Sequence, residues 1–149
     1  MQAARIWFQN TVPPITLSQI KEYLQGMGIK VRDVERRLGD YVVPQLYITN
    51  PADLLMQIED EDWVIEEAEQ FSQFAPASIR DRLSICNARL CFGDARDDSI
   101  NTDHGTFVLA GWTSFDPGKP QAKKLLESLA RLVNGLFEDN TTGDWWAPI

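Results

Sequence analysis

The side chains best suited to chemistry lie in DARDDSINTDHG, residues 94–105, which contains four aspartates and a histidine. A calcium-binding loop of the EF-hand type needs oxygen ligands at positions 1, 3 and 5, a glycine at position 6 and a carboxylate at position 12. Counted from Asp94, positions 3, 6 and 12 are Arg96, Ser99 and Gly105, so the spacing excludes an EF-hand. Two interpretations stay open for this segment: a solvated loop between strands, and a looser Ca²⁺ or Mg²⁺ site.

His104 is the only histidine of the chain, so a zinc site or a nucleophile–histidine pair would have to include it. No ligand spacing typical of zinc supports such a site, and no G-x-S-x-G nucleophile elbow occurs. Cys86 and Cys91 do not form a C-x-x-C motif and are expected to be buried thiols. We therefore expect no catalytic residue, no metal and no cofactor. The alternative is a small metal-dependent hydrolase that uses the 94–104 loop.

A second concentration of carboxylates lies in IEDEDWVIEEAE, where residues 59–69 include seven acids and no base. A general acid needs a carboxyl group whose pKa is raised by partial burial, and the sequence pattern does not indicate one. The acids suit either a solvated helix face or a negative docking surface for a basic protein. In the second case the partner-binding carboxylates are Glu59, Asp60, Glu61, Asp62 and Glu66, joined by Asp97 and Asp98 of the loop.

Two adjacent tryptophans, Trp145 and Trp146, follow the turn-rich stretch EDNTTG. Neighbouring residues of an extended segment point to opposite sides. We therefore expect one ring to pack on the protein and the other to be presented to a partner, since tryptophan is enriched at interface hot spots. The alternative is a segment folded back on the core.

Hydrophobic periodicity indicates the elements that must position these groups. Helical spacing predicts helices over residues 15–28, 60–74, 77–84 and 116–135. Short apolar or alternating runs predict strands over residues 6–8, 29–38, 42–49, 53–59, 88–94, 106–115 and 136–139. Pro44 has to stand at the start or the edge of its strand, because it lacks a backbone N–H.

This order mixes helices and strands without strict alternation, which indicates a single α+β domain over residues 1–149. The simplest packing is a two-layer sandwich, with an antiparallel or mixed sheet and helices mainly on one face. The strand–helix–strand order at both ends of the chain adds the hypothesis of two ferredoxin-like halves.

Composition and charge limit the classes of partner that we expect. The chain has 44% hydrophobic and 24% charged residues, as soluble globular proteins do. No apolar run reaches the roughly 20 residues of a membrane span, and the first residues lack the pattern of a secretory signal. We therefore expect a cytoplasmic protein without a membrane partner. A net charge of −8 repels phosphate backbones, so we expect no nucleic-acid partner, and it favours a basic protein partner.

The segment QAKKLLESLARLVNG, continued by LFEDNTTGDWW, resembles the end of small acidic bacterial immunity proteins. In those domains a last helix leads to a glycine, an apolar pair, an acid and a turn with Gly-Asp or Gly-Glu. The resemblance implies a protein that binds a cognate toxin and blocks it, and it carries over no individual functional residue. Our hypothesis is a non-enzymatic binding protein of this kind. The alternatives are the hydrolase and a structural domain that dimerises through a sheet edge or the tryptophan segment.

Overall fold

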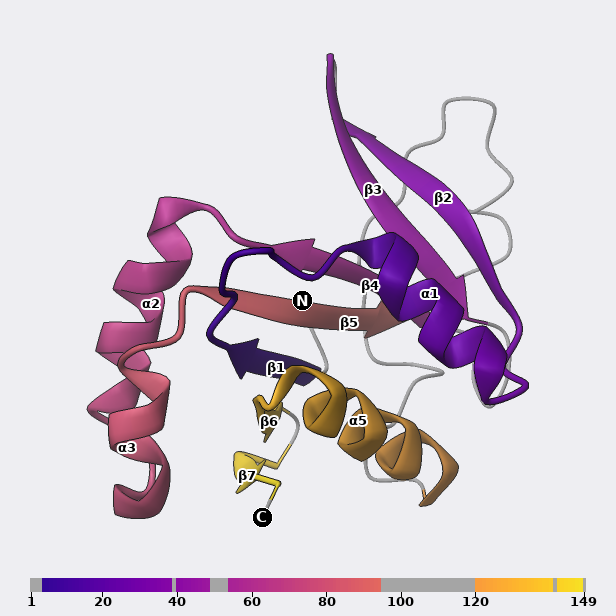
Figure 1. Ribbon diagram of the computed structural model, residues 1–149. Helices are drawn as coiled ribbons and strands as arrows, with labels where there is room; N and C mark the ends of the chain where they lie inside the picture. Colours follow the sequence, from indigo (N-terminus) through magenta and orange to yellow (C-terminus); the bar gives the residue numbers. More distant parts are fainter. Residues whose placement is uncertain (1–3, 39, 49–53, 95–119, 141, 149) are drawn as a thin grey trace.

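The computed structural model of the chain describes residues 4–38, 40–48, 54–94, 120–140 and 142–148. Its elements, labelled in Figure 1, are in chain order β1 (Ala4–Phe8), α1 (Leu17–Gly26), β2 (Val31–Leu38), β3 (Tyr41–Ile48), β4 (Leu54–Glu59), α2 (Asp62–Ser72), α3 (Ala77–Leu83), β5 (Ala88–Asp94), α5 (Pro120–Val133), β6 (Leu136–Asp139) and β7 (Asp144–Trp146).

The described strands form one antiparallel sheet in the order β2-β3-β4-β5-β1-β6-β7. The sheet is open, and with the helices it confirms the predicted α+β class. β1 lies between β5 and β6, and both of these strands are antiparallel to it. β1 and β2 are joined by α1 but lie on either side of β5, β4 and β3, a wider separation than the split unit of a ferredoxin-like half.

Side chains alternate along each strand and divide the core between the two faces of the sheet. Ile6 of β1 belongs to the larger core, together with Ile20 of α1 and Leu126 of α5. Trp7 points to the opposite face and joins a smaller core with Val64 of α2 and with α3. α1 and α5 contribute to the same core, and Figure 1 shows α2 and α3 together at one end of the sheet. A second, smaller helical layer is thus added to the predicted sandwich.

Local signals account for where α1 begins and ends. Thr16 and Gln19 form a capping box, in which the Thr16 hydroxyl accepts from the Gln19 backbone N–H (3.2 Å) and the Gln19 side chain accepts from the Thr16 backbone N–H (2.9 Å). This pairing supplies acceptors for backbone N–H groups that have no partner within the helix at its start. Just past the helix, Gly28 has a φ of 79°, a left-handed conformation that suits glycine.

The strand that contains Pro44 is internal to the sheet, which the sequence did not lead us to expect. β3 pairs with β4 over Leu46–Ile48, and Pro44 stands before this stretch, opposite Glu35 of β2. The proline therefore takes no N–H away from the ladder with β4. β7 was not predicted, because the polar residues around it hid a three-residue strand. The strand predicted over 106–115 lies outside the described residues.

Candidate functional site

The second face of the sheet carries a polar row instead of a continuous apolar surface. Glu59 of β4 and Trp7 of β1 both stand directly opposite Arg89 of β5, one on each side of it. A parallel row places Arg5 of β1 between Cys91 of β5 and Glu138 of β6. The polar side chains of both rows therefore point to the same face, where α2 and α3 pack.

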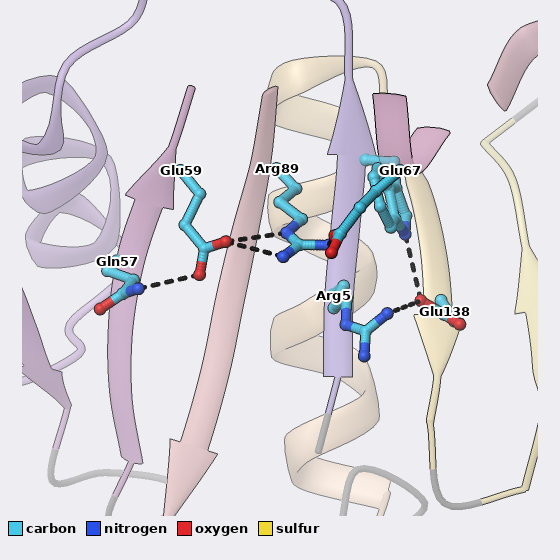
Figure 2. Close-up of polar contacts among 7 residues, drawn as sticks. Arg5, Gln57, Glu59, Glu67, Arg89 and Glu138 are labelled. Atoms are coloured by element: carbon cyan, nitrogen blue, oxygen red, sulfur yellow. Dashed lines mark hydrogen bonds and ion pairs between the residues drawn. The ribbon is translucent and has the colours of Figure 1, made fainter. Parts of the chain in front are cut away.

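Arg89 is the centre of this arrangement. Its side chain is 6% exposed and binds two carboxylates, with Nη2 at 2.8 Å from Oε2 of Glu59 and Nη1 at 2.6 Å from Oε2 of Glu67. Its Nε donates to the same Glu59 oxygen at 2.9 Å. The guanidinium also lies 4.8 Å from the centre of the Trp7 ring and 5.0 Å from that of Trp63. Figure 2 shows Glu59 and Glu67 on either side of Arg89.

The charged groups of this cluster keep one another ionised. Burial by itself would raise the pKa of Glu59, but Arg89 and hydrogen bonds from Arg89, Cys91 and Gln57 outweigh it and hold the pKa below its ordinary value. Burial would likewise lower the pKa of Arg89, and the electrostatic influence of Cys91, Glu59 and Glu67 raises it instead. Both groups stay ionised, because each supplies the countercharge that the other has lost from water.

Two of the contacts to Arg89 come from α2 and fix the rotation of that helix. Trp63 and Glu67 are four residues apart, so they lie on the same side of α2 and both reach the buried guanidinium. Arg80 of α3 secures the other end, because it donates to the carbonyl oxygens of Ser72, the last residue of α2 (3.2 Å), and of Ala75 just after it (3.4 Å). α2 thus has one defined outward face.

That outward face is acidic. Five exposed carboxylates lie along it and just before it: Asp60, Glu61, Asp62, Glu66 and Glu69. No ion pair with a described residue is found for any of them. Asp62 lies in the first turn, where a negative charge suits the helix dipole. Asp62 and Glu66 are four apart and Glu66 and Glu69 three apart, spacings at which like charges destabilise a helix. The stability of α2 therefore does not explain why carboxylates gather on its outward face.

Large apolar side chains lie beside the acids. Phe74, after the end of α2, is 87% exposed, and within the helix Trp63 is 42% and Ile65 46% exposed. Trp63 and Glu67 are not among the site residues predicted from the sequence. The signal that could have found them is their spacing of four residues, which puts both on the side of α2 that faces Arg89. We call the five carboxylates with Trp63, Ile65 and Phe74 the α2 surface.

The structure separates the predicted docking carboxylates. Asp60, Glu61, Asp62 and Glu66 are exposed on the α2 surface. Glu59 is 8% exposed, and its carboxylate is bound by Arg89, so it is not presented to a partner. The reason is its place at the end of β4, directly opposite Arg89. Asp97, Asp98 and His104 lie outside the described residues.

The two tryptophans of β7 do not behave as one anchor and one presented ring. They do point to opposite faces, as their adjacency predicted, but both are half-buried. Trp146 packs on the larger core with Arg131 5.1 Å from its ring centre, and Trp145 packs on the smaller core. Each ring packs on a core because both faces of the sheet are covered by helices. The segment is folded back, and neither ring is fully presented.

A small pocket opens between the end of α2 and β7. It has a volume of about 230 Å³ and is lined by Arg5, Phe71, Phe74, Ala75, Glu138, Asn140 and Trp145. Oε1 of Glu138 accepts from Trp7 Nε1 at 3.1 Å. The same oxygen accepts from Arg5 Nη1 at 3.4 Å (Figure 2). The pocket therefore combines aromatic walls with an ion pair that is already formed, and it borders the α2 surface at Phe74.

The buried polar row continues away from Arg89 through two amides. Nε2 of Gln57 donates to Glu59 at 2.9 Å, and Nε2 of Gln45 donates to Gln57 at 2.6 Å. The Glu59 carboxylate can only accept, so it fixes the orientation of both amides. Oε1 of Gln45 is left buried without a partner among the described residues.

Both cysteines lie in the described part of the chain, and burial acts on the pKa of each thiol. Burial raises the pKa of Cys86 to about 12 and that of Cys91 well above its ordinary value. Both cysteines are free and buried, as the sequence predicted. No three His, Cys, Asp or Glu residues within the described ranges form a group that could hold a metal ion.

No helix in the described ranges is long and apolar enough to span a membrane.

Comparison of the chain with family models, with curated proteins and with solved structures finds no match in any of the three.

Proposed function

We propose that this protein is a non-enzymatic binding protein that presents the α2 surface to a basic protein partner. The observation that carries the proposal is the outward face of α2, on which the exposed carboxylates have no cationic partner among the described residues while Arg89 fixes the helix from beneath. An approaching basic surface relieves the repulsion between neighbouring acids and is attracted over a long range.

The apolar members of the α2 surface give such an encounter a means of becoming a stable complex. Interface cores are enriched in aromatic side chains, and charged groups at the rim steer association more than they add affinity. Phe74 and Trp63 supply the aromatic area, and Glu66 and Glu69 supply the steering charges. We expect the aromatic residues to limit dissociation and the acids to accelerate association.

The class of binding protein that we favour is an immunity-type inhibitor of a basic bacterial toxin, acting in the cytoplasm. The support is the resemblance of residues 121–146 to the end of such proteins, together with the net charge of −8. Its mechanism is occlusion: α2 covers a basic cleft that the toxin needs for its own substrate. No step of this mechanism requires a catalytic group of the chain.

Dimerisation through a sheet edge is less well supported. β2 forms one edge of the sheet, and the exposed part of its length includes Arg32, Asp33 and Glu35. Charged residues on an edge strand oppose pairing with a second copy.

The experiment that tests the proposal compares three tagged proteins as baits in a lysate of the source organism. They are the wild type, the α2 variant Glu66→Lys/Glu69→Lys and the control Glu22→Lys/Asp144→Lys, which makes the same charge change at exposed positions elsewhere. A partner that is retained by the wild type and the control, and lost by the α2 variant, is expected. The activity of that purified partner should fall in proportion to added chain. Retention by all three baits, or an activity that the chain leaves unchanged, would refute the inhibitor.

A further inference from the structure

A second pocket lies away from the α2 surface, where the ends of α3, α5 and β1 meet. Its volume is about 380 Å³, within the range of small-molecule sites. Phe8, Ile85, Val133 and Leu136 provide apolar walls, and its polar lining consists of Gln9, Thr11, Arg82 and Asn134.

The pocket owes its shape to a close approach of two chain segments. A side chain at Gly135 would bring its Cβ to 2.7 Å from the backbone oxygen of Trp7 and 2.7 Å from Cγ2 of Ile6. Asn134 before it has a φ of 51°, and the Gly135 N–H closes α5 through a 2.8 Å bond to the carbonyl of Ala130. The turn from α5 into β6 is therefore pressed against β1, and this brings Asn134 and Leu136 to the pocket.

The charge of the lining is opposite to that of the whole protein. Among the residues that the structure describes, its ionisable lining residues are Arg82 and the buried thiol Cys86, with no Asp or Glu. Arg82 makes no ion pair with a described residue, whereas Arg89 binds two carboxylates and Arg80 binds the end of α2. Arg82 is partly buried, and a guanidinium beside a pocket whose described lining has no carboxylate suits an anion.

We propose that this pocket binds a small organic carboxylate, with Arg82 holding the carboxylate group and the apolar walls holding an aryl or alkyl body. A single guanidinium matches a single negative charge, whereas a phosphate ester would call for more positive charge than the lining has. The neutral donors Thr11, Gln9 and Asn134 can complete the hydrogen bonds of the second carboxylate oxygen or of a polar substituent. The site is separate from the α2 surface and does not depend on the proposed protein partner.

The test is a titration with 3-phenylpropanoate, followed by two-dimensional NMR of the backbone amides. Its alcohol analogue, 3-phenylpropan-1-ol, has the same apolar body without the charge. We expect the acid to shift the amide signals of Thr11, Arg82 and Asn134 and to bind at least about tenfold more tightly than the alcohol, since a charge-assisted hydrogen bond is then gained.

Three variants locate the site. Arg82→Met removes the cation and should weaken acid binding by about tenfold or more. Ile85→Glu, at a position that is 59% exposed, places a carboxylate at the mouth and should weaken it as well without disturbing the core. Arg32→Met makes the same exchange on β2, away from the pocket, and should leave binding unchanged. The proposal is overturned if acid and alcohol bind equally, if millimolar acid shifts none of the three signals, or if Ile85→Glu binds as the wild type does.

Discussion

Glu59 and Arg89 lie directly opposite each other on β4 and β5, and their side chains form a buried ion pair of 2.8 Å. The same guanidinium binds Glu67 and lies against the ring of Trp63, so one arginine joins the sheet to α2. The pair therefore does more than satisfy two buried charges. It sets which face of α2 is turned outward.

Removal of Arg89 should cost far more stability than removal of an exposed cation. Arg89→Met removes the ion-pair partner of the buried Glu59 carboxylate, and we expect a loss of about 3–5 kcal/mol in the free energy of unfolding. Lys21→Met, which breaks the solvent-exposed pair with Asp33, should cost less than about 1 kcal/mol. Urea denaturation measures both. Adding Glu59→Gln to Arg89→Met should recover part of the loss, and an equal cost for the two single variants would contradict the assigned role of Arg89.

The same pair predicts a loss of stability in acid. Because the folded protein holds the pKa of Glu59 below its ordinary value of 4.5, the unfolded chain takes up the proton first as the pH falls. The contribution of Glu59 is present above about pH 4.5 and is lost as the pH falls through the folded pKa. Urea denaturation between neutral pH and about pH 3 should show a shallower decline for Glu59→Gln than for the wild type. Parallel declines would mean that the Glu59 pKa is not lowered.

Both cysteines should resist thiol reagents in the folded protein. Burial raises the pKa of Cys86 to about 12 and that of Cys91 well above its ordinary value, so neither forms the reactive thiolate near neutral pH. Absorbance with a chromogenic disulfide at about pH 8 should report no rapid reaction in buffer and two reactive thiols in denaturant. Stability should also fall as the pH rises from 9 toward 12, because the unfolded thiols ionise first. Rapid labelling of a folded thiol would contradict the burial of that residue.

Two glycine-to-alanine exchanges should act in opposite directions. Gly135→Ala forces a Cβ against the backbone of Trp7, and we expect a loss of about 1–3 kcal/mol or more. Gly26→Ala, at the end of α1 with nothing within 4 Å, should be neutral or stabilise by up to about 1 kcal/mol. Thermal and urea unfolding test this pair. A harmless Gly135→Ala would show that α5 and β1 are not pressed together at this turn.

Most of the described elements could be predicted from the sequence, because their apolar residues repeat at the period of a helix or a strand. Val64, Ala68 and Phe71 marked one face of α2 in this way, and the structure buries Val64 and Ala68 completely. The sequence Asn134-Gly135 is typical of a helix end, and Asn134 takes the left-handed conformation there, with a φ of 51°.

The candidate site was predicted only in part, because a helix face can be read locally and a cross-strand partner cannot. The exposure of Glu66 can be predicted from the helical periodicity of α2 alone. Glu59 belongs to the same acidic run in the sequence, yet it is buried because Arg89, thirty residues later, stands opposite it. The contacts of individual arginines also depend on distant partners: Arg89 forms its ion pairs with Glu59 and Glu67, whereas Arg80 binds backbone carbonyls. The pocket at Arg82 is lined by three segments that lie far apart in the sequence, so no local sequence pattern indicates it.

The most direct measurement of the central claim is the association rate constant of the chain with its purified basic partner at low and at high ionic strength. If the α2 surface steers the encounter, the Glu66→Lys/Glu69→Lys variant should associate at least about tenfold more slowly than the wild type at low salt, and the difference should shrink as salt screens the charges. The control Glu22→Lys/Asp144→Lys should associate much faster than the α2 variant at low salt, and this difference should also shrink at high salt. Equal association rates for the α2 variant and the control would show that the partner does not approach through α2.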